Sequence, residues 1–287
     1  MRKINILAFI FILSLLVTAC GQTNASNEKQ TLTLGTTEAT LDFWKVVKEE
    51  AKKKGLNLEL KTFTGGVDLN QLTEDGEIDA NSFQHLAYLA SWNKTRKSEL
   101  VADIATIAAP LGIYSKTRKS LKDIKKGDKI AIPNDDSNWP RALVLLQNAG
   151  LIKLKDDFNG QGGEDKILEN PYNLDIVPAQ AANLPRLLDD VDAAVINNGT
   201  ALEAGYKLKS SLYHESKKEA PYVNVVAVTK DVQKEKRKEL DTITEILHSK
   251  KVTDYITNHY EGNFLPVTTP IDQLLKEYDK ALQKEGA

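Results

Sequence analysis

The strongest constraint on the fold of this chain is a repeated alternation between two hydrophobic periods. Residues 31–35, TLTLG, alternate apolar and polar side chains with a period of two, as a half-buried strand does. Residues 42–54 instead carry apolar side chains at helical spacing, with Gly55 in the position of a C-cap, and residues 56–60 return to period two. A strand, a helix and a strand in this order predict a parallel pair joined by a right-handed crossover.

The alternation recurs along the chain and predicts an α/β fold. Two apolar strands, residues 102–109 and 222–229, flank the middle section and are interpreted as crossovers between two lobes. We predict one lobe from residues 31–112 and 224–287 and a second lobe from residues 113–223. Ligands of such sheets bind outside the carboxyl ends of strands, so the binding site is expected in the cleft between the lobes. Further expected elements are strands at 129–133, 174–177 and 191–196 and helices at 137–148, 184–188, 233–249 and 251–260.

The N-terminus has the pattern of a secretory signal. Arg2 and Lys3 precede an apolar run over residues 6–17, which is too short to cross a bilayer, and small residues lead to Cys20. The run and its cysteine resemble a bacterial lipobox, in which the thiol carries a fatty acyl group such as palmitate and the chain is cut before the cysteine. We predict a signal peptide over residues 1–19 and a lipid-anchored tether over 20–30. The alternative is an ordinary signal peptide with a chance cysteine.

Composition and charge exclude several function classes. The 287 residues are 41% hydrophobic and 27% charged, as in a globular protein, and the net charge of −2 lacks the basic footprint that nucleic acid requires. Cys20 is the one cysteine, which excludes an internal disulfide, a cysteine nucleophile and a thiolate metal site. No motif of a serine hydrolase, a zincin or a P-loop enzyme occurs. The four histidines form no close pair, so a zinc receptor is only weakly supported.

Two strand ends carry groups suited to a zwitterion. Residues 133–141, PNDDSNWPR, lead into a helix whose N-terminal N–H groups favour an anion, so Arg141 in its first turn is explained if it binds a carboxylate. The alternative is a surface arginine paired with Asp135 or Asp136. Residues 194–199, AVINNG, end in two asparagines, whose amides could bind an ammonium and a carboxylate, or could simply form an Asn-Gly turn.

Two further segments carry aromatic and polar side chains together. Residues 78–89 contain Phe83, His85 and Tyr88, which suit an apolar ligand side chain or, alternatively, form an ordinary core cluster. Residues 221–224, PYVN, add Asn224 at the second crossover, where the alternative is a plain hinge strand.

These segments, in this order behind a lipobox, resemble the NlpA/MetQ family of methionine-binding lipoproteins. The resemblance covers nearly the whole mature chain and is most specific over residues 132–154. It implies a type II periplasmic-binding-protein fold and an extracytoplasmic receptor, lipid-anchored to the membrane, that takes up amino acids with the permease and ATPase of an ABC transporter. It implies no cofactor, no metal and no enzymatic activity. The implied ligand is L-methionine or a closely related amino acid. The alternatives are a receptor of the same fold for a Met-containing dipeptide or another small amino-acid-like ligand, a zinc receptor and a lipid-anchored enzyme.

The resemblance also implies roles for individual residues. Arg141 would bind the ligand carboxylate, and Asn197 and Asn224 would bind the head group. The residues implied to line the side-chain pocket are Phe83, His85 and Tyr88, with Tyr114 and Asn138 as secondary candidates.

The chain departs from the family at two places. Thr64-Gly65-Gly66 replaces larger residues, and the loop TTEATLDFW introduces Phe43 and Trp44. We expect these two aromatic residues, with Trp139 near the head group, to reshape the pocket.

Overall fold

The computed structural model describes residues 30–64, 66–216 and 222–285. The predicted signal peptide, Cys20 and all of the predicted tether except Gln30 lie outside the described residues, as does Gly65. Residues 31–287 form one compact unit. Among the described helices, none is both long enough and apolar enough to cross a bilayer.

Six strands of the described chain form a mixed sheet in the order β13-β4-β12-β3-β1-β2. The strand β1 pairs in parallel with β2, as the first sequence repeat predicts, and also with β3, whereas β12 runs antiparallel to β3 and β4. The strands are β1 (Thr31–Thr37), β2 (Asn57–Phe63), β3 (Ala80–His85), β4 (Val101–Ala108), β12 (Val223–Val228) and β13 (Leu265–Pro266).

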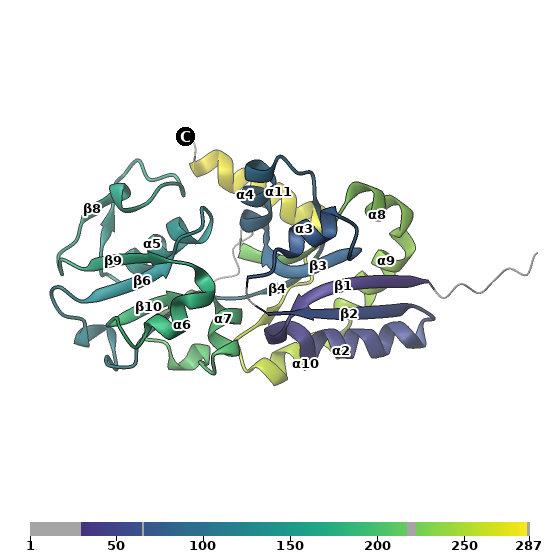
Figure 1. The fold of residues 1–287 in the computed structure, drawn as a ribbon, viewed down its shortest axis with the longest axis horizontal. Helices are drawn as coiled ribbons and strands as arrows, with labels where there is room; N and C mark the ends of the chain where they lie inside the picture. Colours follow the sequence, from purple (N-terminus) through teal and green to yellow (C-terminus); the bar gives the residue numbers. More distant parts are fainter. Residues whose placement is uncertain (1–29, 65, 217–221, 286–287) are drawn as a thin grey trace, which may run out of the picture. The chain divides into compact units, whose positions relative to one another are not determined.

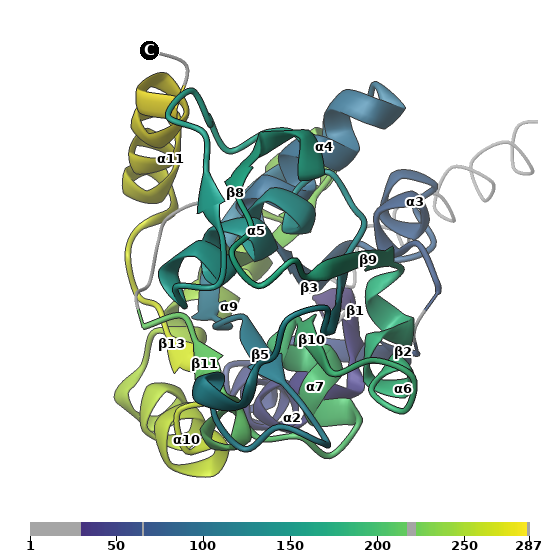
Figure 2. The ribbon, with the colours of Figure 1, turned by 90° about the vertical axis from the view of Figure 1, so that its left-hand side faces the viewer.

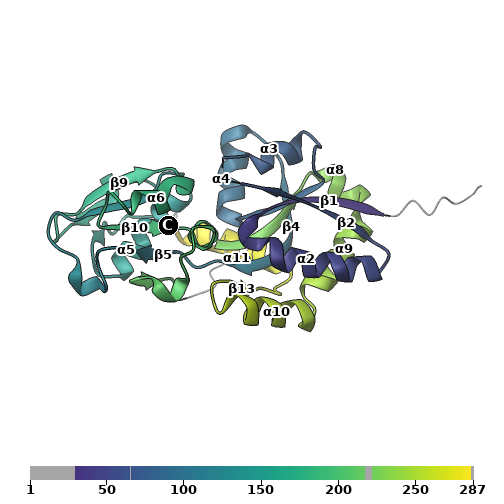
Figure 3. The same cartoon turned by 60° about the horizontal axis from the view of Figure 1, so that its bottom comes forward.

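Helices cover both faces of this sheet because its strands are apolar on both sides. On β12, Val226 and Val228 pack toward α2 (Glu38–Lys53), α9 (Arg237–Leu247) and α10 (Lys250–Tyr260). The alternate residues Val225 and Ala227 pack toward α4 (Leu86–Arg96) and α11 (Ile271–Glu285). Figure 1 shows α4 and α11 on one side of the sheet and α2 and α10 on the other, and Figure 3 again places α2 and α10 together. The short helices α3 (Leu69–Glu74) and α8 (Lys230–Glu235) complete this region.

A second sheet of five described strands has the order β11-β5-β10-β6-β9. Along β10, Ala193 and Val195 face the core under α5, and Ala194 and Ile196 face α6 and α7. Figure 2 shows α5 and α6 on opposite sides of this sheet. Its elements are β5 (Gly112–Tyr114), β6 (Lys129–Pro133), α5 (Asn138–Asn148), β9 (Asp175–Ala179), α6 (Leu184–Leu187), β10 (Ala193–Ile196), α7 (Asn198–Glu203) and β11 (Tyr213–His214), with a small hairpin of β7 (Lys153–Leu154) and β8 (Ile167–Glu169) and the 3-10 turns η1 (Leu121–Asp123), η2 (Glu164–Lys166), η3 (Ala181–Asn183) and η4 (Leu208–Ser210).

The C-terminal region differs most from the expected elements. The helix expected over 251–260 is confirmed as α10, whereas the helix expected over 233–249 is divided into α8 and α9, and α11 was not expected. The hydroxyl of Thr229 accepts from Val232 N at 3.2 Å and begins α8, and Ser249 caps α10 in the same way. The Ser249 cap lies at the predicted boundary between two helices, whereas the Thr229 cap begins a short helix that the hydrophobic period does not separate from α9. At the other end, α2 begins four residues before the predicted residue 42.

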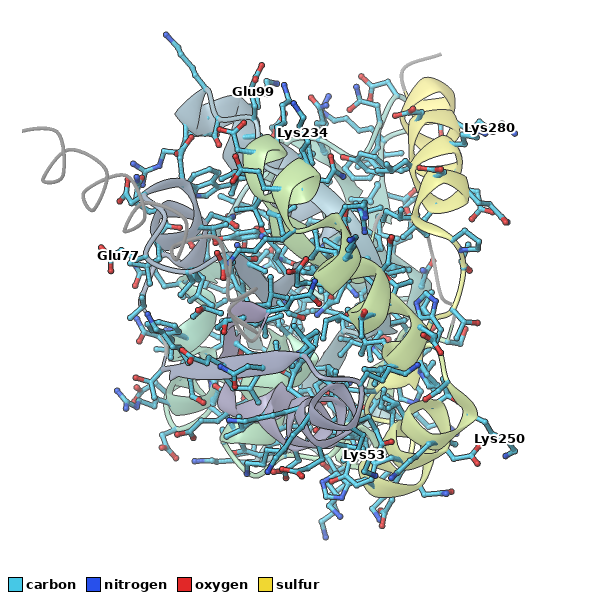
Figure 4. All side chains as sticks on the ribbon, turned by 90° about the vertical axis from the view of Figure 1, so that its right-hand side faces the viewer. Lys53, Glu77, Glu99, Lys234, Lys250 and Lys280 are labelled. Atoms are coloured by element: carbon cyan, nitrogen blue, oxygen red, sulfur yellow. The ribbon has the colours of Figure 1, made fainter. Side chains whose placement is uncertain are left out.

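Two chain segments and the hydrogen bonds of one residue connect the two sheets of the described chain. Residues 109–111 lead from β4 to β5, and residues 215–222 lead from β11 to β12. The third connection is made by Asn263, whose Oδ1 accepts from Leu208 N at 2.6 Å and whose carbonyl oxygen accepts from Asn198 Nδ2 at 2.5 Å. The surface is polar: the labelled lysines and glutamates of Figure 4, such as Lys250 and Lys280, lie at the outside of the molecule.

Candidate functional site

A cleft of about 920 Å³ lies where strand ends from both sheets meet. The strand β1 ends at Thr37 and β3 ends at His85, while Asn134 follows β6 and Asn197 follows β10. All four residues line the cleft, at the carboxyl ends where the sequence predicts the site. The predicted site residues that line it are Phe83, His85, Tyr88, Asn138, Arg141, Asn197 and Asn224.

Arg141 lies in the first turn of α5 and is almost fully buried, with 3% of its surface exposed. Its Nε and Nη2 donate to the two carboxylate oxygens of Glu215 at 2.7 and 2.6 Å, which makes a bidentate ion pair. Nη2 also donates to the carbonyl oxygen of Ala109 at 3.1 Å, and the guanidinium carbon lies 4.2 Å from the centre of the Tyr222 ring. The burial of this charge is therefore compensated on one edge of the guanidinium.

The pairing of Arg141 with Asp135 or Asp136, which the sequence left open, is wrong. Asp135 instead organises the start of α5, because its Oδ1 accepts from Ser137 N at 3.2 Å and from Asn138 N at 2.9 Å. Both of its carboxylate oxygens also accept from Asn138 Nδ2 at 3.1 Å. The predicted helix start is confirmed. The group that caps it is the carboxylate of Asp135 and not the side chain of Ser137.

Asn138 connects the two sheets across the cleft. Its Oδ1 accepts from Asn197 Nδ2 at 3.0 Å and lies 3.1 Å from His85 Nε2. Its Nδ2 is engaged by Asp135, so the amide orientation is fixed by partners on both ends. This amide, a secondary candidate from the sequence, lies at the centre of the polar half of the cleft.

His85 is held as a neutral imidazole. Its Nδ1 accepts from Tyr88 N at 3.1 Å and caps α4, so the ring proton is on Nε2, which donates to Asn138 Oδ1. Burial first, and the positive charge of Arg141 second, lower the pKa of His85 to about 4. Protonation of Nδ1 would also remove the cap of α4.

Asn197 and Asn224 present amides to the cleft from opposite sheets. Asn197 Oδ1 is buried and has no hydrogen-bond partner among the described residues. A buried, unpaired carbonyl oxygen is an acceptor suited to a ligand ammonium. The alternative of a plain Asn-Gly turn is wrong, because Asn198 and Gly199 form the first turn of α7. On β12, the carbonyl oxygen of Asn224 accepts from the hydroxyl of Thr106 at 3.0 Å, which fixes its backbone.

Aromatic rings form the other half of the cleft. Phe83 and Tyr88 meet edge to face with centroids 5.9 Å apart, and His85 meets Tyr88 at 6.3 Å and Tyr222 at 5.5 Å in the same manner. The rings of β3 and α4 therefore stand beside the polar groups of α5, as a ligand with a polar head and an apolar side chain requires.

Tyr114 lies away from the cleft. It is 1% exposed and packs among Leu184, Ile196 and their neighbours in the core of the five-stranded sheet. Burial raises the pKa of its hydroxyl group to about 12. The structure thus places Tyr114 in the core and not among the cleft residues.

The three aromatic residues expected to reshape the pocket also lie elsewhere. Phe43 and Trp44 are fully buried in the core between α2 and the six-stranded sheet. Trp139 packs on the core under α5, and its ring faces Gly163 so closely that a Cβ there would lie 3.0 Å from it. Helical periodicity directs each of these rings inward, away from the cleft.

The sequence missed one wall of the cleft. Phe63, Val67 and Leu69 line it together with Thr64 and Gly66. Val67 is 43% exposed, which is high for an aliphatic side chain in the folded chain. The departure noted at residues 64–66 was the only signal, because an irregular loop has no periodicity.

Arg186 was also missed. It follows the start of α6, lines the cleft and is exposed. Nothing in its local sequence distinguishes it from a surface cation, and no hydrogen bond of its guanidinium group is found in the described part of the chain. Nor do the described residues bring together a group of three His, Cys, Asp or Glu side chains that could bind a metal.

The neutral His85 predicts an acid-dependent loss of stability. Its folded pKa of about 4 lies below the unfolded value of 6.5, so the unfolded chain binds the proton first. Its contribution is complete above pH 6.5 and is lost as the pH falls toward 4. Relative to a His85→Gln variant, the free energy of unfolding of the wild type should fall by about 3 kcal/mol between about pH 7.5 and 4, as urea unfolding can measure. A difference that stays constant over this range would contradict the neutral imidazole.

Comparison with known proteins gives a consistent result. Residues 32–268 match the family described as NlpA lipoprotein. The D-methionine-binding lipoprotein MetQ of Escherichia coli (strain K12) is 43% identical over 190 residues, which cover 65% of this chain and 70% of MetQ. The crystal structure of protein PG110 from Staphylococcus aureus has a TM-score of 0.81 at 39% identity and covers 87% of this chain and 99% of its own.

A nutrient binding protein from Burkholderia cenocepacia, solved bound to methionine, has a TM-score of 0.77 at 39% identity and covers 82% of this chain and 99% of its own. These structures confirm the predicted two-lobed α/β fold. The family consists of substrate-binding proteins, which confirms the prediction that the chain is not an enzyme. With a family match over most of its length, the chain belongs to the NlpA lipoprotein family.

Proposed function

We propose that this protein is an extracytoplasmic receptor that captures L-methionine and delivers it to an ABC importer. The observation that carries the proposal is the composition of the cleft. Buried Arg141, the amide of Asn138 and the unpaired Oδ1 of Asn197 stand beside the rings of Phe83 and Tyr88. The relatives support methionine as the ligand: MetQ is described as D-methionine-binding, and the Burkholderia cenocepacia protein was solved bound to methionine.

The groups in the cleft match the parts of a free amino acid. The guanidinium of Arg141 attracts a carboxylate, and Asn197 Oδ1 accepts from an ammonium. Asn224 borders the cleft from the other sheet and completes the proposed head-group site. A thioether gains about 0.3–1.5 kcal/mol from contact with aromatic rings, which the rings of Phe83, His85 and Tyr88 provide.

The proposed function includes a division of the chain into the two lobes predicted from the sequence. Residues 31–112 with 224–287 would carry the six-stranded sheet, and residues 113–223 would carry the five-stranded sheet. Separate cores for the two sheets support the division, and so do the two connecting segments near residues 110 and 220. A receptor built in this way closes its lobes on the ligand.

Removal of the arginine should nearly abolish binding. Loss of one partner of a buried charge pair costs about 2–5 kcal/mol, so Arg141→Ala should raise the methionine Kd by about 30-fold or more. Arg141→Lys keeps a charge beside Glu215 but not the two-donor fork, so it should also bind weakly while it folds. Calorimetry and thermal unfolding of each variant measure these effects.

Arg186→Ala is the matched control for this experiment, because Arg186 is an exposed arginine that lines the same cleft. Its Kd should change by less than about 3-fold, as expected for an exposed charge. Near-normal affinity in a folded Arg141→Ala protein, or a large loss in Arg186→Ala alone, would contradict the carboxylate role of Arg141.

A second candidate ligand is a Met-containing dipeptide, which the cleft volume of about 920 Å³ favours. A thermal-shift panel should separate the candidates, because a ligand that binds the folded state raises the melting temperature with concentration. We expect methionine, tested as both enantiomers, to give the largest shift, followed by Gly-Met and Met-Gly. A shift with glutamate or lysine and none with methionine would contradict the pocket assignment.

We also propose that Cys20 anchors the protein, through lipid, to the outer face of the cytoplasmic membrane or to an equivalent extracytoplasmic leaflet. The proposal rests on the lipobox pattern and on membership of a lipoprotein family. Because one acyl chain binds a bilayer only marginally, stable attachment requires at least two chains on this residue. Cys20→Ser should leave the protein unprocessed or release it from the membrane fraction, as fractionation and mass spectrometry of the N-terminus would show. Membrane retention and processing equal to wild type would refute the anchor.

A further inference from the structure

We propose that Glu215 is the positioning residue of the head-group site, which holds Arg141 in place across both connecting segments and makes the site selective for a zwitterion over an anion. The inference rests on the proposed function, because it concerns how Arg141 meets the ligand. Neither the sequence pattern nor the charge of its neighbours singles out Glu215, which lies 74 residues from its partner.

The ion pair fixes the orientation of the guanidinium. Nε and Nη2 of Arg141 bind the two oxygens of Glu215, and Nη2 also binds the carbonyl oxygen of Ala109. Of the five guanidinium N–H donors, these contacts use three. The two donors on Nη1 have no hydrogen-bond partner among the described residues, and Arg141 lines the cleft. The edge paired with Glu215 is thus structural, and the other edge is available to a ligand.

Glu215 is itself held by the first connecting segment. Its Oε2 accepts from Leu111 N at 2.8 Å, and its own N–H donates to the carbonyl oxygen of Leu111 at 3.0 Å. Leu111 directly precedes β5, and Glu215 directly follows β11. The carboxylate therefore has three donors on its two oxygens and cannot turn away without breaking backbone contacts.

Through this pair, one guanidinium touches both segments that connect the sheets. Arg141 contacts the first segment at Ala109, and it contacts the second at Glu215 and at the ring of Tyr222. The proposed ligand-binding cation is thereby held by described residues of both segments. A carboxylate on the Nη1 edge would meet a guanidinium that is already oriented, which reduces the entropy lost on binding.

The pair also sets the charge that a ligand meets. The positive charge of Arg141 is balanced by Glu215 before any ligand enters. A zwitterion adds no net charge to this buried site, whereas a ligand without an ammonium leaves one negative charge uncompensated. With Glu215 neutralised, the same site would carry a net positive charge and would accept the anion more readily.

The experiment compares methionine with 4-(methylsulfanyl)butanoate, which has the same side chain and carboxylate but no ammonium. Calorimetry gives the ratio of their dissociation constants, anion over zwitterion, for wild type, Glu215→Gln, Glu215→Asp and the surface control Glu169→Gln. We expect the ratio to fall by at least about 10-fold in Glu215→Gln and to stay near wild type in Glu215→Asp and Glu169→Gln. Glu169 forms an exposed ion pair with Lys153 at 3.2 Å and serves as a carboxylate far from the cleft.

The outcomes separate the two proposals. If wild-type protein binds neither compound, the proposed ligand is wrong, whatever the variants do. If wild type binds methionine and both ligands weaken in parallel in folded Glu215→Gln, so that the ratio is unchanged, Glu215 has only a structural role and the inference is overturned. If Glu215→Gln fails to fold, Glu215→Asp decides, because it keeps the charge but has a shorter side chain. Methionine should then bind more weakly, at an unchanged ratio of the two dissociation constants. Methionine affinity equal to wild type would exclude the positioning role.

Discussion

The site depends on one buried charge. A guanidinium removed from water is tolerated only when its donors are satisfied and its charge is balanced, and the bidentate contact of Arg141 with Glu215 supplies both. The rest of the polar cleft is arranged around it. The charge of Arg141 contributes to the neutral state of His85, which in turn donates to Asn138, and Asn138 holds the amide of Asn197. The only acceptor left open in this chain of contacts is Asn197 Oδ1.

The two sheets bring these groups together because each ends its parallel strands at the cleft. Strand β3 delivers Phe83 and His85, and the turn after β6 delivers Asn138 on the first residue of α5. Each sheet has its own helices on both faces and its own core. The cleft therefore forms without a ligand, and hydrogen bonds within the protein preorganise its polar groups.

Regular elements and local caps could be predicted from the sequence, whereas distant pairings could not. The strands at 31–35 and 129–133 and the helix from Asn138 to Asn148 follow from period and turn chemistry. Seven of the eight ligand candidates line the cleft, because they lie at strand ends that meet there or in the first turns of the helices that follow those strands. Tyr114 does not, since its strand turns it toward the core. Glu215 and the cleft-lining residues Thr64, Gly66 and Val67 lie outside helices and strands, where no period marks the side that faces the site.

The cap that His85 provides to α4 has a consequence for a receptor held outside the cytoplasm, where the surroundings set the acidity. Because Nδ1 is occupied by the backbone of Tyr88, the imidazole keeps one tautomer and stays uncharged at any pH well above its folded pKa of about 4. A moderate fall in external pH then lowers the free energy of unfolding and does not change the protonation of His85 in the folded cleft. At pH values well above 4, every folded copy offers the ligand the same pattern of donors and acceptors, so mild acidity lowers the stability of the receptor and leaves its affinity for the ligand unaltered.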